Sequence, residues 1–341
     1  MIVRLLSVRP FLILSLLLIL SGKMMAQQRA GMEIDFFGYI DNREYKSTYT
    51  KDKTILGTIV SPKLYFAIDS NNRIVTGIHY NQDFGKNKDN KDIVKPIAYY
   101  SYESQKFSFA LGHMPRYERL NDVPRLVMAD TFMYDRPNIE GIYFAYHNKG
   151  FKQHIFVDWL SKQSYTQRER FMVGTSGKFR KGNLYLANDI TLYHNALTSN
   201  DSIVQHIQDN GIALVRLGAD LTNKTALDSL SIEAGFAFGF DRVRTEYEMR
   251  FAKGFLAQFY LGYKKFFVGN TLYLGQAQNL PLGDSFYHHN RYNRLDFGWT
   301  PFKKGNLDGR FTASLHWTPD GASNQQAFTL RYRFGKTLWK N

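Results

Sequence analysis

Side chains that could form a hydrolytic or metal site come closest together in one polar segment near the C-terminus. Asp284, Ser285, His288 and His289 lie within six residues of one another, between two segments with strand-like patterns. Adjacent histidines on one strand would point to opposite faces, so a pair of this kind does not form a metal site by itself. The favoured interpretation is a solvated loop, and an Asp–Ser–His hydrolase site remains the alternative.

Local enzyme motifs are absent from the sequence. It contains no HExxH, no GxSxG and no GxGxxG after a strand. Residues Gly335, Lys336 and Thr337 match the last three positions of a phosphate-binding loop. The position five residues earlier, where such a loop requires glycine, is Leu330. With Cys 0, disulfides, thiolate metal sites, cysteine nucleophiles and a lipid-modified cysteine are also excluded. The sequence therefore predicts no enzyme, no cofactor and no metal site.

The elements that must position these residues alternate apolar and polar side chains with a period of two. The pattern is clearest in 328–334, 310–317 and 230–241, and a weaker form occurs in 32–41 and 73–82. Period-two alternation is typical of strands with two different faces. The whole chain contains about 16 such segments, within a range of about 14–18.

The connections between these segments alternate in length. Short turn signals such as 148–150 and 181–183 alternate with longer polar stretches such as 196–210 and 277–290. A rhythm of short turns and long loops is expected for a membrane barrel with one tight end. A soluble β-sandwich is the alternative, but aromatic residues near the ends of the apolar faces favour a membrane boundary. We predict an all-β fold, a closed antiparallel transmembrane β-barrel.

The N-terminus predicts export from the cytoplasm. Arg4 and Arg9 precede an apolar run at 11–21, and Ala26 is a plausible cleavage point. At ~1.5 Å per residue this run is too short for a hydrocarbon core of ~30 Å. We therefore expect a signal peptide at 1–26 and one outer-membrane barrel domain at 27–341. Cleavage would remove three basic residues and no acid from a chain whose formal net charge is +14.

With these features the sequence resembles the porin-like outer-membrane β-barrels of Gram-negative bacteria. The resemblance covers the whole mature chain and includes an aromatic closing strand, in which Phe328, Leu330, Tyr332 and Phe334 are expected to face lipid. One departure is that residues 335–341 follow the terminal aromatic residue, where porin-like chains commonly stop. The resemblance implies location in the outer membrane, with membrane lipids as partners and compatibility with a homo-oligomer.

The inner faces of the predicted strands carry nearly balanced charge. The candidates for lining a pore are Lys63, Arg216, Glu233, Arg294, Asp296, Arg310, Arg331 and Arg333. Four of these arginines fall on the last three predicted strands, where they could form a basic wall that attracts anions. A ladder of internal ion pairs to Asp296 and Glu33 is the equally open alternative.

Segment 113–138 is long, lacks alternation and contains many apolar residues. Asp122 followed by Pro124 predicts a short helix near its middle, and loops of this length are usually functional or disordered. We expect it either to narrow the channel or to pack on the outer rim. The residues expected at such a constriction are Arg116, Arg119, Arg125, Asp130 and Arg136.

The function predicted from these features is passive diffusion of small hydrophilic solutes across the outer membrane, with a preference for anions as the expected direction. A second hypothesis is a barrel that anchors or assembles a surface or secretion complex, and a third is an outer-membrane hydrolase. None of the features indicates nucleic-acid binding.

Overall fold

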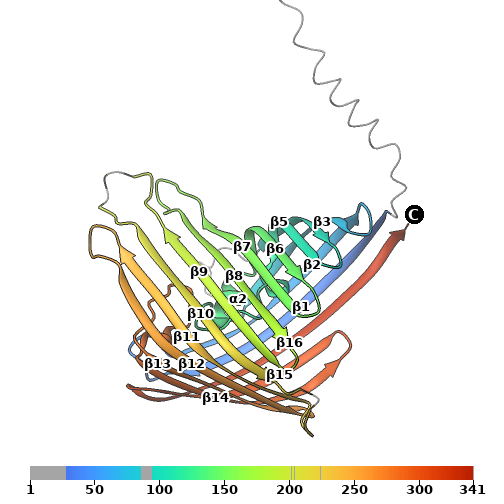
Figure 1. Ribbon diagram of the computed structural model, residues 1–341. Helices are drawn as coiled ribbons and strands as arrows, with labels where there is room; N and C mark the ends of the chain where they lie inside the picture. Colours follow the sequence, from blue (N-terminus) through green and yellow to red (C-terminus); the bar gives the residue numbers. More distant parts are fainter. Residues whose placement is uncertain (1–27, 86–93, 201, 203, 223, 341) are drawn as a thin grey trace, which may run out of the picture.

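A computed structural model describes residues 28–85, 94–200, 202, 204–222 and 224–340 of the chain. Within these residues, 16 strands form a closed barrel, in which each strand pairs antiparallel with the next and β16 pairs with β1 (Figure 1). The predicted closed antiparallel β-barrel of about 16 strands is confirmed. The expected signal peptide at 1–26 lies outside the described residues.

The strands are β1 (Arg29–Glu44), β2 (Lys53–Ala67), β3 (Asn72–Asp83), β4 (Val94–Glu103), β5 (Phe107–Pro115), β6 (Asn138–His147), β7 (Phe151–Ser161), β8 (Arg170–Lys181), β9 (Leu184–Asn195), β10 (Gln208–Asp220), β11 (Ser229–Val243), β12 (Arg250–Tyr263), β13 (Phe266–Gly275), β14 (Arg291–Lys304), β15 (Leu307–Thr318) and β16 (Gly321–Lys340).

Each strand turns an apolar face outward and a mixed face inward. In β10, for example, Val215 and Leu217 are exposed on the outside, whereas Leu214 and Arg216 are buried in the lumen. Exposed apolar side chains around a closed barrel are stable when lipid, and not water, surrounds them. The chain therefore has the porin-like transmembrane β-barrel fold that the sequence predicted.

The described part of the chain contains no helix that is long and apolar enough to span a membrane.

The barrel closes between its first and last strands. Phe334 pairs with Ile34 and Phe328 with Ile40, while Tyr332 and Phe334 are exposed on the outer face. The strand does not stop at Phe334, because β1 begins at Arg29 and offers backbone partners as far as Lys340. The residues that follow the terminal aromatic are thus part of the closing ladder.

The two ends of the barrel differ in the length of their connections. At the turn end, which also holds both chain ends of the barrel, residues 182–183 join β8 to β9 and residues 305–306 join β14 to β15. Gly182 and Gly305 have φ values of +62° and +58° there, which glycine adopts without steric cost. At the loop end, the connections 116–137 and 276–290 are long enough to fold back over the lumen.

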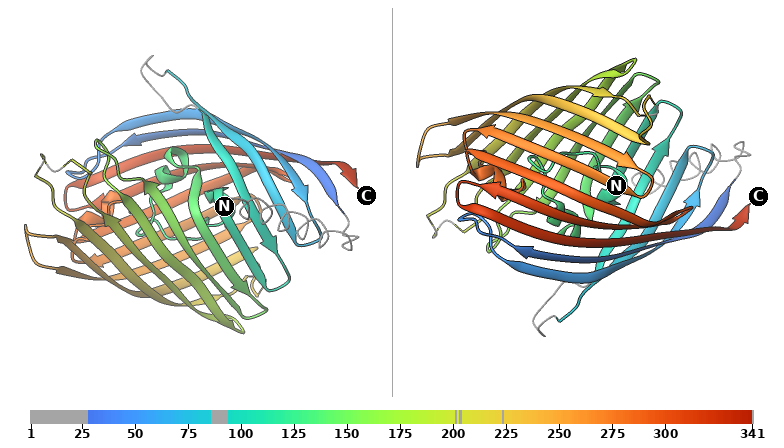
Figure 2. Two further views of the ribbon diagram at one scale, coloured as in Figure 1. Left: turned by 90° about the horizontal axis from the view of Figure 1, so that it is seen from above. Right: turned by 90° about the horizontal axis from the view of Figure 1, so that it is seen from below.

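Residues 116–137, called the luminal segment below, enter the barrel interior (Figure 2). The segment contains a 3-10 helix, η2 (Arg116–Glu118), and a short α-helix, α2 (Asp130–Asp135). The prediction of a helix starting near Asp122 is wrong. Residues 124–128 form a single turn, because the backbone N–H of Ala129 bonds to Leu282 O at 2.8 Å instead of continuing a helix.

The luminal segment packs between two apolar clusters of the inner wall. Leu120 and Met128 belong to a cluster on the β3–β9 side, whereas Leu126 and Val127 belong to one on the β10–β14 side. The loop 276–290, with its 3-10 helix η3 (Ser285–His288), covers the second cluster. Apolar contacts on both sides fix the segment across the lumen.

Candidate active site

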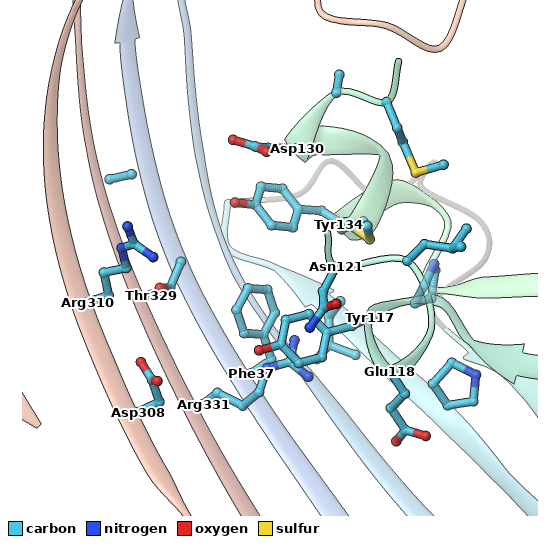
Figure 3. A pocket seen from close by; sticks show the side chains of 18 of the residues that line it. Phe37, Tyr117, Glu118, Asn121, Asp130, Tyr134, Asp308, Arg310, Thr329 and Arg331 are labelled. Carbon is cyan, nitrogen blue, oxygen red and sulfur yellow. The ribbon is translucent and has the colours of Figure 1, made fainter. Parts of the chain in front are cut away.

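A cavity of about 380 Å³ lies between the luminal segment and the wall formed by β1, β2, β15 and β16. Figure 3 shows Asp308, Arg310 and Thr329 on that wall, across the gap from Asp130 and Tyr134 of the luminal segment. Charged, aromatic and aliphatic side chains share the lining. A cavity lined in this way suits a molecule with both polar and apolar parts.

All the residues predicted to line a pore lie on the inner faces of their strands: Lys63, Arg216, Glu233, Arg294, Asp296, Arg310, Arg331 and Arg333. Most of them are paired with acids. Arg294 donates to Asp296 at 2.7 Å, and Lys63 lies 3.1 Å from a carboxylate oxygen of Glu33. The structure thus has the internal ion pairs to Asp296 and Glu33 that the sequence left open.

Arg310 differs from its neighbours because it makes no ion pair with any described residue. Its guanidinium carbon lies 4.0 Å from the ring centroid of Phe267, and its side chain borders the cavity. Arg331, by contrast, donates to Asp35 at 2.8 Å. Of the predicted basic wall, Arg310 therefore carries the charge that is most available to a bound anion.

The luminal segment carries all the residues predicted for a constriction: Arg116, Arg119, Arg125, Asp130 and Arg136. Arg116 is fully buried and donates to Asp158 of β7 at 2.6 Å, while Arg119 donates to Glu103 of β4 at 2.8 Å. Arg136 contributes its backbone carbonyl, which accepts from Arg116 Nε at 2.9 Å. The bonds to Asp158 and Glu103 hold the segment to the wall. Most arginines of the segment therefore have a structural role.

Two carboxyl groups of the luminal segment are held in the charged form. Burial is the largest influence and opposes ionisation of both Glu118 and Asp130. Neighbouring cations together outweigh it, with Lys63 contributing most at Glu118 and Arg125 most at Asp130. The pKa of each carboxyl is consequently lowered. The corresponding distances are 2.8 Å to Lys63 Nζ and 2.6 Å to Arg125 Nε.

The Asp–Ser–His candidate in the loop 276–290 is not assembled. The Asp284 carboxylate accepts a hydrogen bond from the backbone N–H of Phe286 at 3.2 Å and thereby caps η3. Among the described residues, no hydrogen bond joins the side chains of Asp284, Ser285 and His288. Asp284 is therefore a helix cap in this structure.

A different hydroxyl–imidazole–amide relay is present on the inner wall. Ser61 Oγ lies 2.7 Å from His79 Nδ1, and His79 Nε2 lies 2.8 Å from Asn138 Oδ1. Ser61 and His79 line the cavity, and all three side chains are at most 5% exposed. A hydroxyl joined to an imidazole that a third group orients is the arrangement of a nucleophile and its general base.

The hydrogen bonds around Asn138 define the tautomer of the histidine. Asn138 Nδ2 donates to the carbonyl oxygen of Pro96 at 2.7 Å, so its Oδ1 is the atom that faces the ring. That oxygen can only accept, so His79 Nε2 must carry the proton. His79 Nδ1 is then unprotonated and accepts from the Ser61 hydroxyl, as a general base would.

The sequence brings these three residues together through strand pairing and not through a local motif. Ser61 on β2 and His79 on β3 belong to adjacent strands, and Asn138 begins β6 directly after the luminal segment. The β2–β3 ladder skips Ser61 and Pro62, because proline has no N–H to donate. The only sequence signal was an inward-facing histidine in the weakly alternating segment 73–82.

Comparison with solved structures identifies the same fold in outer-membrane proteins. A loop-deletion variant of OmpT, an outer membrane protein of Vibrio cholerae, has a TM-score of 0.59 with 7% identity, over 90% of this chain and 99% of that chain. An anion-selective porin from Comamonas acidovorans gives 0.54 and 8%, over 90% and 99%. Among curated proteins, none matches the sequence.

A family model covers nearly the entire chain. It is described as lipid A 3'-O-deacylase-type, and it matches residues 23–341. The prediction that the protein is not an enzyme is therefore wrong, since a deacylase is an enzyme. Local enzyme motifs consist of residues close together in the sequence, whereas the relay described above joins residues from three strands.

Proposed function

The chain belongs to the lipid A 3'-O-deacylase-type family, and from this premise we propose that it hydrolyses an acyl ester inside the barrel. The proposed nucleophile is Ser61, with His79 as general base and Asn138 as the residue that orients the imidazole. The observation that carries the proposal is the Ser61–His79–Asn138 relay at the wall of the main cavity.

The proposed reaction has two steps. Ser61 Oγ attacks the ester carbonyl carbon and passes its proton to His79 Nδ1, which then protonates the departing alcohol. A water molecule next gives a proton to His79 Nδ1 and attacks the acyl–serine ester, and that proton returns to Ser61 as the carboxylic acid leaves. Throughout, Asn138 accepts from the Nε2–H, and this bond favours the tautomer that can act as a base.

The cavity lining supports an acyl ester as substrate. Ile59, Leu120 and Met133 provide apolar surface for an acyl chain, and Arg310 provides a positive charge for an anionic group on the alcohol portion. The family description names an acyl ester of a lipid as its substrate. We extend that substrate class to this chain as part of the proposal.

Replacing the nucleophile tests the proposal. In barrel reconstituted in lipid vesicles, Ser61→Ala should lower the rate of fatty-acid release from lipid A by about a thousandfold or more, because the proposed nucleophile is then missing. Ser176→Ala is the matched control, since Ser176 is also a buried luminal serine but bonds to Asp189 at 2.6 Å and to no histidine. Equal rates for wild type and Ser61→Ala would refute the assignment of Ser61.

The second candidate function is passage of small hydrophilic solutes. The length of the cavity along the strands favours it. Its lining on β16 runs from Gln325 near the loop end to Arg331 nearer the turn end. Positions six residues apart on a strand are separated by about 20 Å. If solutes follow this path, Arg310, which has no ion-pair partner among the described residues, should favour anions, because a charge at a narrow section repels ions of the same sign.

The channel candidate has its own measurement. In a planar bilayer with a salt gradient, Arg310→Glu should shift the reversal potential toward cation preference. Arg294→Gln combined with Asp296→Asn should shift it little, because this ion pair loses one positive and one negative charge together. A wild-type barrel that conducts no ions would remove this candidate and leave the hydrolase proposal untouched.

A further inference from the structure

Five residues form one row across the outside of the barrel near its loop end. They face one another directly on β7 to β11, in the order Trp159, Phe171, His194, Asp209 and Arg242. The row lies on the outer face, because it alternates with the inward-facing Leu160, Met172 and Tyr193 along the same strands. A polar group of this kind is unexpected on a lipid-facing wall.

The residues on either side of the row indicate the depth at which it lies in the membrane. The next outward row toward the turn end consists of Val157, Val173, Leu192, Gly211 and Phe240, which are all apolar. Toward the loop end, each strand of the row ends within a few residues. The row therefore stands at the edge of the apolar band, at the depth of the lipid headgroups.

The polar half of the row carries excess positive charge. Asp209 accepts from His194 Nδ1 at 2.8 Å, from Arg242 Nη2 at 2.8 Å and from Arg244 Nε at 2.9 Å. One carboxylate thus holds two guanidinium groups, whose side chains remain 33% and 45% exposed. The bonds to Asp209 use Nη2 of Arg242 and Nε and Nη2 of Arg244. Nη1 of each arginine makes no hydrogen bond to a described residue, so donors of these partly exposed groups remain available to an anion.

The aromatic half of the row provides apolar contact beside this charge. Trp159 stacks on Phe171 with ring centroids 5.2 Å apart, and the Phe171 ring lies 5.0 Å from that of His194. Aromatic side chains prefer the membrane interface, where one part of the ring is apolar and the other meets water. The row thus combines a surface for the start of an acyl chain with fixed arginines.

We propose that this row, together with the adjacent Arg244, binds the phosphate group of an anionic lipid in the leaflet at the loop end. Two guanidinium groups fixed by one carboxylate can donate to phosphate oxygens in the planar geometry that phosphate favours. A membrane lipid is the expected source, because the site stands on the outer wall at the edge of the apolar band. The inference goes beyond the proposed hydrolysis, which takes place on the other side of the barrel wall.

Lipid binding to the purified barrel tests the inference without any enzyme assay. Native mass spectrometry in neutral detergent would compare phosphatidic acid with phosphatidylcholine of the same acyl chains, for wild type and for Arg242→Ala with Arg244→Ala. The double variant should bind phosphatidic acid about tenfold or more weakly, because hydrogen bonds to a charged group are lost. Resistance of each barrel to unfolding in SDS would show that it is folded.

A matched control separates this site from general charge attraction. Lys303→Ala with Lys304→Ala removes two exposed basic side chains at the turn end and should leave binding unchanged. Equal binding by wild type and the arginine variant would overturn the proposal, as would an equal loss in the lysine control or a wild type that does not prefer phosphatidic acid. Displacement of the lipid by inorganic phosphate alone would also overturn it, since the site would then recognise a free anion.

Discussion

At the scale of single residues, the face of the strand on which a side chain lies determines its role. Ser61 and His79 face the lumen and form a relay, whereas His194 and Asp209 face outward and join an ion-pair cluster at the membrane edge. The same residue types thus meet different surroundings. Because the side-chain period of a strand is two, a neighbour along the chain has the opposite environment.

A pair of arginine substitutions on β16 tests this assignment of faces. Leu330 lies near the centre of β16 on the outer face, and Thr329 next to it lines the cavity. Leu330→Arg should lower the free energy of unfolding in lipid vesicles by about 2–4 kcal/mol, because it places a charge in the hydrocarbon region. Thr329→Arg should lower the free energy of unfolding much less. Urea denaturation measures this free energy for both variants. Equal losses would mean that the faces of the strand are assigned wrongly.

At the scale of elements, ion pairs to the wall hold the luminal segment in place. Glu118 bonds to Lys63 of β2, and Asp122 bonds to Lys152 of β7, each at 2.8 Å. Both carboxyl groups have a lowered pKa. Burial opposes their ionisation, but the neighbouring positive charges and hydrogen bonds, mainly those of Lys63 and Lys152, together outweigh it. A lowered carboxyl pKa contributes stability that is present above the ordinary pKa and is lost as the pH falls through the lowered value.

The luminal segment should therefore loosen in acid while the barrel stays closed. The ordinary pKa values of Glu118 and Asp122 are 4.5 and 3.8, so the contribution is complete above about pH 5 and declines below about pH 4. Hydrogen–deuterium exchange, corrected for the intrinsic rate, should show faster exchange in 116–137 at about pH 3 than at pH 7. Peptides from β10 and β11 are the control. Unchanged protection of 116–137 would contradict the anchoring role.

At the scale of the whole molecule, the fold was predictable from local patterns but the site was not. Alternation in 328–334 and 230–241 depends on near neighbours in the sequence, so it predicts strands and the barrel that they form. The relay depends on contacts between residues 18 and 59 positions apart. No spacing in the sequence fixes contacts of that kind, since they arise from the register of strand pairing and from the folding of the luminal segment.

This dependence on strand register also explains why the sequence predicted neither the pairing of the basic wall nor the enzymatic activity. A basic wall was expected from Arg294, Arg310, Arg331 and Arg333 because their strands are neighbours, but the sequence could not tell which of them is paired. Only Arg310 lacks a carboxylate partner among the described residues. Likewise, Ser285 and His288 are close in sequence but no hydrogen bond joins their side chains, whereas Ser61 and His79 are distant in sequence and hydrogen-bonded.

Covalent labelling of the proposed nucleophile tests the central claim most directly. A fluorophosphonate probe reacts with a serine hydroxyl that a base has activated, and its site is located by peptide mass spectrometry. We expect one adduct for each folded barrel, on Ser61, and strongly slowed labelling in His79→Gln because the base is missing. Hydrolysis of acyl esters by a barrel in which Ser61 stays unlabelled, or an adduct on Ser285 instead, would contradict it.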